Sequence, residues 1–215
     1  MLKIHGADLS GPALKVRYVA NALGLEHEYK RVNIMGGENR AEAYLKLHPA
    51  GKIPVLEDDG FVLFESNAII KYLADKNGSR FYPKDLKKRA VVDQWIDFSS
   101  MHVGMALSKV FYNRVIAQRI GDKVDEGSLK DGLKFLDKFL SLVDNQLKKS
   151  KYLAGNEMTL ADFDLLAVLD PSEVAGVDLS PYQAIVKWRD PLRKEDFYQK
   201  CHKVYGESMM AQSKK

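Results

Sequence analysis

The spacing of hydrophobic positions changes once along the chain. Up to residue 75, short apolar runs of strand length alternate with segments whose apolar residues recur every three or four positions, and beyond residue 88 only the helical spacing remains. This pattern predicts a first part that mixes strands and helices and a second part built from helices alone. In the first part we expect the order β-α-β-α-β-β-α, at residues 2–5, 12–23, 29–34, 41–47, 55–56, 61–64 and 67–75.

The last two predicted strands form a hairpin. Residues 58–60, Asp-Asp-Gly, separate two apolar strands, and Gly60 can adopt the positive φ that a tight turn requires. Pro54 opens the first of these strands, a place where a strand tolerates proline. Ser66 follows the second strand and precedes an apolar helix, so we expect it to cap that helix. The free N–H groups of such a helix start also attract an anion.

The second part of the chain predicts several helices. One face of a long helix is indicated by Val91, Trp95, Phe98, His102 and Met105, and a second long helix by Leu129, Leu133, Leu136, Leu140, Val143 and Leu147.

Polar residues mark where other helices begin and where the chain changes domain. Thr159 and Asp162 suit the first turn of another helix, as a cap and as an acid that complements the helix dipole, and we interpret them as structural. Asp190-Pro191 is expected to restart a last helix, and residues 212–215 to fray. We therefore predict two domains, residues 1–78 and 88–215, joined by a turn-rich linker at 79–87.

Composition excludes several classes of protein. The chain has 215 residues, 46% of them hydrophobic and 29% charged, which is enough for a proper core. A net charge of +4 without a long basic run argues against nucleic acid binding, and no apolar run is long enough to span a membrane. With a single cysteine, Cys201, and no signal peptide at the start, we expect a cytoplasmic protein. The five histidines lack metal-ligand spacing, so we expect no metal.

Two motifs resemble the glutathione-binding half of the cytosolic glutathione S-transferases. Residues 51–58 read Gly-Lys-Ile-Pro-Val-Leu-Glu-Asp, and residues 63–69 read Leu-Phe-Glu-Ser-Asn-Ala-Ile. Residues 6–10, Gly-Ala-Asp-Leu-Ser, followed by Arg17, are similar to the first motif of the serine-type phi and theta-like branches. That loop has no Tyr or Cys, so the tyrosine-dependent and thiol-transfer classes fit badly. The resemblance implies a thioredoxin-like N-terminal domain, a C-terminal helical bundle domain and a homodimer.

The resemblance also implies a site for glutathione. Pro54 is expected to follow a cis peptide bond, with the backbone of Ile53 pairing with the cysteinyl unit. Glu65 would take the γ-glutamyl amine and Ser66 the γ-glutamyl carboxylate. Lys52 would meet the glycyl carboxylate, while Asn39 and Arg40 stand where the family often has a His-Lys pair. The implied set is Asn39, Arg40, Lys52, Ile53, Glu65 and Ser66.

Ser10 has two possible roles. It precedes a helix start at Pro12, so it can simply cap that helix. Its hydroxyl can also donate to a bound thiolate, helped by the helix dipole, and the resemblance favours this catalytic role. Ser10 would not itself be the nucleophile, because no Gly-x-Ser-x-Gly elbow is present.

The second substrate is expected to meet the helical domain. Met101, His102, Met105 and Phe111 offer adaptable apolar surface, although core packing or a dimer contact would explain them equally well.

The sequence therefore predicts a glutathione transferase. The glutathione thiolate, stabilised by Ser10, would attack an electrophilic apolar co-substrate or reduce an organic hydroperoxide. The alternative is a non-catalytic carrier or assembly module, because fold alone does not determine function. A thioredoxin-type oxidoreductase is excluded by the lack of Cys near the first helix, and Cys201 is interpreted as a packed or idle thiol.

Overall fold

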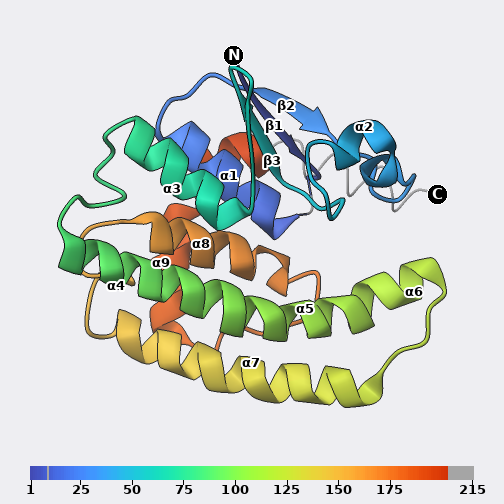
Figure 1. Cartoon of the computed structure of the whole chain (residues 1–215). Coiled ribbons are helices and arrows are strands. Elements are labelled where there is room, and N and C mark those ends of the chain that lie inside the picture. Colours follow the sequence, from blue (N-terminus) through green and yellow to red (C-terminus); the bar gives the residue numbers. More distant parts are fainter. Residues whose placement is uncertain (9, 203–215) are drawn as a thin grey trace. The chain divides into compact units, whose positions relative to one another are not determined.

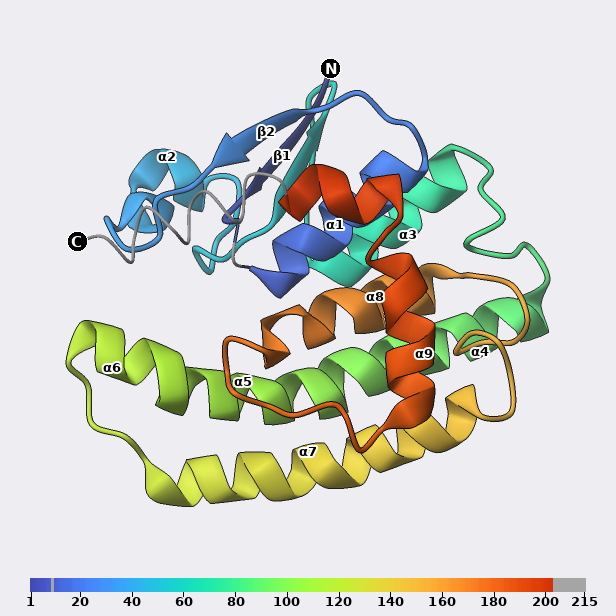
Figure 2. The same cartoon turned by 180° about the vertical axis from the view of Figure 1, so that it is seen from behind.

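The computed structural model describes residues 1–8 and 10–202, and the predicted frayed tail at 212–215 lies outside them. The chain forms two compact units (Figures 1 and 2). The N-terminal unit contains Met1–Arg80 together with the segment that begins at Arg193, and the helical unit contains Phe81–Leu192.

The N-terminal unit is built on a mixed four-stranded sheet. Its strands are β1 (Leu2–Gly6), β2 (Glu28–Arg31), β3 (Val55–Asp58) and β4 (Phe61–Phe64), in the order β2-β1-β3-β4. β1 and β2 are parallel, and the other two pairs are antiparallel. Helices α1 (Gly11–Ala22) and α3 (Ser66–Lys76) lie side by side, and a short turn η1 (Glu38–Arg40) leads into α2 (Glu42–Leu45) (Figures 1 and 2). This confirms the predicted βαβαββα order of a thioredoxin-like domain.

The β3–β4 hairpin has the turn that its sequence predicts. Asp59 and Gly60 both have positive φ, 48° and 91°, as a two-residue turn matched to strand twist requires. Asp58 belongs to the strand, where it pairs with Phe61, rather than to the turn.

Two predicted element boundaries are wrong. β2 ends at Arg31 rather than at residue 34, because the N–H of Asn33 turns away to donate to Glu38 Oε2 at 2.7 Å. Helix α3 begins one residue earlier than expected, so Ser66 is its first helical residue and Glu65 occupies the cap position.

Helix α1 is buried on almost all sides. Residues 13–20 are all buried, because α1 packs on the sheet, on α3 and on the segment that follows Arg193. In that segment the rings of Phe197 and Tyr198 lie 5.9 and 5.3 Å from the ring of Tyr18. Cys201 is buried in the same place, where its sulfur accepts from Asn21 Nδ2 at 3.3 Å, so it is a packed thiol.

The helical unit begins with one long helical run. It consists of α4 (Leu86–Asp97), α5 (Met105–Phe111) and α6 (Ala117–Ile120), joined by the π-helical segments η2 (Phe98–Gly104) and η3 (Tyr112–Ile116). The helices that follow are α7 (Glu126–Leu147), α8 (Leu160–Leu169) and α9 (Gln183–Leu192). Within the described residues, none of the helices combines the length and the apolar character needed to cross a membrane.

The apolar stripe predicted for this helical run is not its buried side. Val91 and Met105 are 39% and 61% exposed, whereas the positions that follow them, Val92 and Ala106, are buried. The run carries two apolar stripes, and the buried one contains Val92, Ile96, Val103, Leu107 and Val110. Periodicity alone cannot tell which of two such stripes is the core.

Close helix packing explains one glycine of the helical unit. A Cβ on Gly132 of α7 would lie 2.9 Å from Lys109 Cβ and 3.1 Å from the carbonyl oxygen of Ala106, both on α5. Only glycine therefore allows α5 and α7 to approach this closely.

The start of α8 has the predicted capping arrangement. Thr159 and Asp162 form a reciprocal capping box. Asp162 is fully buried and also accepts from Leu153 N and Trp188 Nε1, each at 3.1 Å. Burial raises the pKa of Asp162 to about 6, against the effect of these hydrogen bonds. Both residues have the structural role that we expected.

The predicted helix restart at Asp190-Pro191 is wrong. Pro191 lies in the last turn of α9, and the next helical segment begins at Asp196.

Candidate active site

Ser10 caps helix α1. Its φ and ψ, −89° and 111°, are extended, and its Oγ accepts from the N–H of Ala13 at 3.4 Å. A hydroxyl has one donor and two acceptor positions, so accepting this bond leaves its hydrogen free to donate elsewhere. The cap and the thiolate donor are therefore compatible roles for one side chain. The 12-residue helix also directs the positive end of its dipole at this position.

The loop before Ser10 is tied to the rest of the N-terminal unit through Asp8. Arg31 Nε donates to Asp8 Oδ2 at 2.8 Å, and Arg17 Nη1 lies 3.6 Å from Asp8 Oδ1. Arg17 is buried with its guanidinium 4.0 Å from the centre of the Tyr29 ring. Burial raises the pKa of Tyr29, and the nearby positive charge of Arg17 opposes this effect. Asp8 thus connects the loop to both α1 and β2.

The N-terminus of α3 is held in a strained conformation at Glu65. Its φ and ψ are 70° and 109°, values that cost a non-glycine residue about 1–3 kcal/mol. Its side chain makes no capping hydrogen bond. Ser66 was predicted to be the cap, and this is wrong because Glu65 takes that position. The result is an exposed carboxylate directly beside the N–H groups of a helix start.

Lys15 is a member of this region that the sequence analysis missed. Its ammonium group donates to Ser66 Oγ at 3.3 Å and to Asn67 Oδ1 at 2.5 Å, and the residue is only 3% exposed. The partners are 51 and 52 positions away in sequence, so no local pattern could reveal the contact. Lys15 is buried on α1, and it therefore places a positive charge at the start of α3.

The peptide bond between Ile53 and Pro54 is cis, as the resemblance implied. In the described part of the chain, no hydrogen bond engages the backbone N–H or C=O of Ile53. The neighbouring Lys52 is exposed, and its carbonyl oxygen accepts from the hydroxyl of Tyr44 at 3.0 Å. An extended peptide could therefore pair with Ile53.

Asn39 and Arg40 are placed differently from each other. Asn39 Nδ2 donates to the carbonyl oxygen of Gly51 at 2.6 Å, so this amide braces η1 against the segment before Pro54. Gly51 has a φ of 60°, and a Cβ there would lie 2.7 Å from the Asn39 carbonyl oxygen. Arg40 is exposed and is the better candidate for contact with a ligand.

All the residues predicted to bind glutathione lie in the N-terminal unit, and the predicted second-substrate residues lie in the helical unit. Met101 is 62% exposed, and Phe111 is half-buried. The ring of His102 lies 5.0 Å from those of Phe98 and Phe139. Among the described residues, no group of three or more His, Cys, Asp or Glu is arranged to hold a metal.

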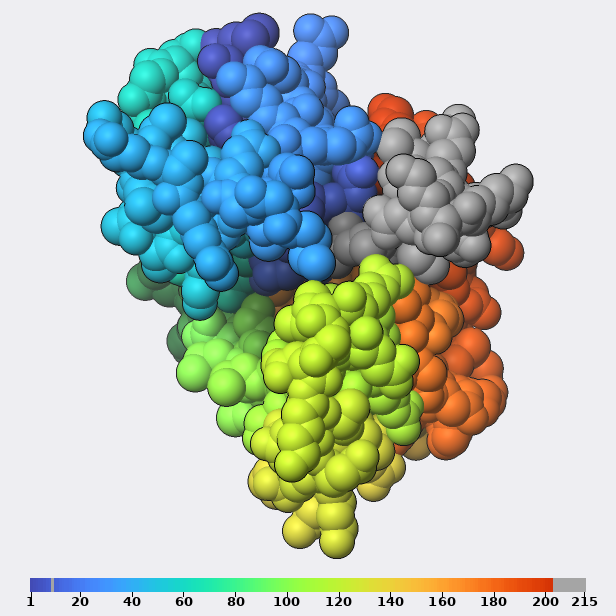
Figure 3. All heavy atoms as spheres, turned by 90° about the vertical axis from the view of Figure 1, so that its right-hand side faces the viewer, coloured from blue at the N-terminus to red at the C-terminus, as the bar shows by residue number. Residues whose placement is uncertain are grey.

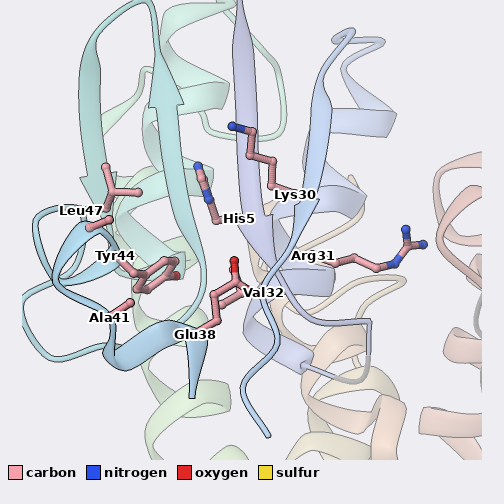
Figure 4. Close-up of a pocket in the computed structure, with 9 residues that line it drawn as sticks. His5, Lys30, Arg31, Val32, Glu38, Ala41, Tyr44 and Leu47 are labelled. Carbon is pink, nitrogen blue, oxygen red and sulfur yellow. The ribbon is translucent and has the colours of Figure 1, made fainter. Parts of the chain in front are cut away.

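A separate cavity of about 480 Å³ lies in the N-terminal unit (Figure 4). The sequence analysis did not predict it, because its walls come from distant segments, and none of the predicted glutathione residues lines it. The lining residues are His5, Lys30, Arg31, Val32, Glu38, Ala41, Ala43, Tyr44 and Leu47.

Comparison with known proteins identifies the family. Residues 8–75 match the family model described as the N-terminal domain of glutathione S-transferase, and residues 105–196 match that of its C-terminal domain. A glutathione S-transferase from Pseudomonas fluorescens is 34% identical, with a TM-score of 0.80, over 91% of this chain and 96% of that one. The chain belongs to the glutathione S-transferase family.

Other solved relatives of this glutathione S-transferase agree with the assignment. Glutathione transferase F7 from Populus trichocarpa is 26% identical with a TM-score of 0.87, over 94% of this chain and 98% of that one. A glutathione S-transferase-I bound with lactoylglutathione is 28% identical with a TM-score of 0.85, over 93% and 97% of the two chains. The match to the plant F7 enzyme is consistent with the serine-type, phi/theta-like branch that the sequence resembles. This glutathione S-transferase is an enzyme with the two-domain fold of that family.

Proposed function

We propose that this enzyme activates glutathione by the serine-type mechanism, with Ser10 donating a hydrogen bond to the glutathione thiolate. The observation that carries the proposal is the state of the Ser10 hydroxyl at the N-terminus of α1. Its oxygen accepts from the N–H of Ala13, and among the described residues its hydrogen donates to no partner. Lowering a thiol pKa from about 8.5 by about two units requires about 2.7 kcal/mol. A hydrogen bond to a charged group contributes about 1.5–3 kcal/mol, which is of the required size.

The glutathione tripeptide would bind across the N-terminal unit. Glu65 takes the γ-glutamyl amine, and Ser66 with the first N–H groups of α3 takes the γ-glutamyl carboxylate. The backbone of Ile53 pairs with the cysteinyl unit, and Lys52 with Arg40 meets the glycyl carboxylate. Support comes from the exposed Glu65 carboxylate, the positive charge of Lys15 beside Ser66, and a relative that is bound with lactoylglutathione.

The reaction follows from the activated thiolate. Its sulfur attacks an electrophilic carbon of an apolar co-substrate, a C–S bond forms, and the leaving group departs with its electron pair. With an organic hydroperoxide, the sulfur attacks the O–O bond and releases an alcohol. A second glutathione then converts the sulfenic acid of the first to the disulfide and water. Apolar co-substrates would contact Met101, His102, Met105 and Phe111. The exposed thioethers of Met101 and Met105 adapt to varied shapes.

We also propose that the enzyme works as a homodimer in the cytoplasm. Family membership supports the dimer. The helical unit adds exposed apolar side chains on α4 and α7, which a second copy could cover. They include Val91, Phe135 and Leu142.

Titration with glutathione and ultraviolet difference absorption across pH test the mechanism together. We expect a thiolate band well below the pKa of the free thiol. Ser10→Ala should remove that band and cut turnover while leaving glutathione affinity nearly unchanged. The matched control is Ser141→Ala, an exposed serine of α7. An equal loss in the control would refute the role of Ser10, and binding without a thiolate band in the wild type would instead favour a glutathione carrier.

A further inference from the structure

One end of the helical unit carries the positive charge excess of the chain. Figures 1 and 2 both show that α4 begins and α7 ends there. Leu160, the first residue of α8, donates its N–H to the carbonyl oxygen of Phe81, so the segment before α4 meets the chain that returns from α7. Residues 84–89 and 148–157 hold seven Lys or Arg and two acids, an excess of five positive charges, whereas the whole chain has a net charge of +4. We call these two segments the basic end.

Three lysines of the basic end lie where helix stability disfavours them. Lys84 precedes Asp85, the cap of α4, and Lys87 and Lys88 lie in the first turn, which contains no acidic residue. The positive end of the helix dipole is at this terminus, so cations here oppose the formation of the helix. By contrast, Lys148 follows the C-terminus of α7 and complements the dipole of that helix. The folding of α4 therefore does not explain its three lysines.

Most of this charge is available to a partner. Lys148 is paired with the buried Asp144 at 2.7 Å, and the Asp85 carboxylate caps α4 by accepting from the N–H of Lys88 at 2.9 Å. Glu157 is exposed and is the other acid of the basic end. Four further lysines are exposed, and among the described residues their ammonium groups have no hydrogen bond or ion pair: Lys84, Lys87, Lys88 and Lys149.

Leu86 stands in the middle of the lysines of α4. It is the first residue of the helix and is 80% exposed, more than any other large apolar side chain in the described part of the chain. A single exposed leucine is common on protein surfaces, so the argument depends on the cations around it. An apolar side chain surrounded by lysines suits the surface of a lipid bilayer, where apolar groups enter the acyl boundary and cations meet anionic headgroups.

The residue types favour a bilayer over nucleic acid or an acidic protein. All the unpaired cations are lysines, which act as point charges, whereas bidentate recognition of phosphate or carboxylate uses arginine. Arg89, the arginine of the basic end, is half-buried and donates to the carbonyl oxygen of Pro83 at 2.7 Å. The ring of Tyr152 is covered by the ammonium group of Lys151, 5.3 Å from its centre, so it is not open for a base to stack on.

We propose that the basic end docks this enzyme reversibly on bilayers that contain anionic lipids. Leu86 enters the boundary between headgroups and acyl chains, and the lysines meet the anionic headgroups. Each lysine near such a surface strengthens binding about fivefold. Because apolar molecules concentrate in bilayers, docking brings the enzyme close to apolar co-substrates. That consequence rests on the proposed function, whereas docking itself does not.

Cosedimentation of the full chain with vesicles tests the docking. Vesicles of phosphatidylcholine with about 30% phosphatidylserine, in about 0.1 M salt, are compared with vesicles of phosphatidylcholine alone. We expect binding to the anionic vesicles only, and its loss when the salt is raised to about 0.5 M. The combined variant Lys84→Gln, Lys87→Gln and Lys88→Gln should bind about a hundredfold more weakly. Leu86→Ser should weaken binding about fivefold or more.

The matched control combines Lys123→Gln, Lys130→Gln and Lys134→Gln, which removes the same charge from exposed positions of the same unit. These lysines lie after α6 and in the first half of α7, toward the end of the helical unit that faces the viewer in Figure 3. The control should bind the anionic vesicles within about twofold of the wild type. Thermal unfolding midpoints check that each variant folds.

Two results would overturn the proposal. One is that the wild type binds no anionic vesicles, or binds them no better than the variant that lacks the three lysines of α4. The other is that Leu86→Ser binds as tightly as the wild type, because the basic end would then respond to charge alone, as a site for an acidic protein would.

The proposed function is tested separately. Ser10→Ala should dock on vesicles like the wild type, and the variant that lacks the three lysines should keep wild-type turnover in the absence of vesicles. Failure of the catalytic proposal therefore leaves the vesicle measurement decisive.

Discussion

Replacing Lys15 by methionine tests whether its buried ammonium contributes to glutathione binding. Lys15 Nζ lies 3.3 Å from Ser66 Oγ. A carboxylate oxygen that accepts from Ser66 lies about 2.7 Å beyond that hydroxyl, and therefore at most about 6 Å from the ammonium. At an effective dielectric constant of about 20, unit charges about 6 Å apart attract by about 2.8 kcal/mol. Lys15→Met should therefore weaken glutathione binding about a hundredfold.

Calorimetric titration of the folded variants with glutathione measures this loss. Methionine keeps an unbranched side chain in the buried space, and Lys87→Met is the control for charge, because Lys87 is exposed in the helical unit. Ser66→Ala should also weaken binding. The double variant should lose less than the sum of the two, because both groups act on one carboxylate. The reasoning is refuted if Lys15→Met binds glutathione within about threefold of the wild type while Ser66→Ala still weakens binding.

Three further predictions follow from the structure. Asp8→Asn should loosen the Ser10 loop, raise the pKa of the bound thiol and lower turnover about tenfold. An unchanged pH–rate profile would contradict this. Gly132→Val should cost about 1–3 kcal/mol of unfolding free energy in urea, because its Cβ would meet Lys109 at 2.9 Å, and an unchanged midpoint would contradict it. Asp162 has a raised pKa of about 6, so its contribution to stability is full below the unfolded pKa of about 3.9 and is lost as the pH rises to about 6. Between about pH 3.9 and pH 6, the free energy of unfolding of Asp162→Asn should rise by about 3 kcal/mol relative to that of the wild type. A difference between the two proteins that does not change with pH would refute the shift.

Local chemistry made several features of the fold predictable. Asp59-Gly60 indicates a two-residue turn. The hydrophobic positions alternate between strand and helix spacing, and this alternation predicts the βαβαββα order. Thr159 and Asp162 are three residues apart, so their capping box is visible in the sequence. The cis bond before Pro54 followed only from the family resemblance, because nothing in the composition of that segment requires it.

The features that could not be predicted depend on tertiary contacts. Ser66 has the right chemistry for a cap, but the positive-φ conformation of Glu65 moves the cap by one residue. Lys15 meets Ser66 only because α1 and α3 pack together, and no local pattern encodes that distance. Val91 and Val92 both belong to apolar stripes, and the packing of neighbouring helices decides that Val92 is the buried one.

The segment that begins at Arg193 also affects the order in which parts of the protein can fold during synthesis. Tyr18 of α1 is fully buried, and Phe197 and Tyr198, which cover it, are among the last described residues to be synthesised. During translation the N-terminal unit must wait for the whole helical unit to emerge before its apolar surface is closed. Domains usually fold from the N-terminus onward as the chain is made. Here the unit that leaves the ribosome first is the one completed last, so we expect nascent chains that stop before Arg193 to depend on chaperones.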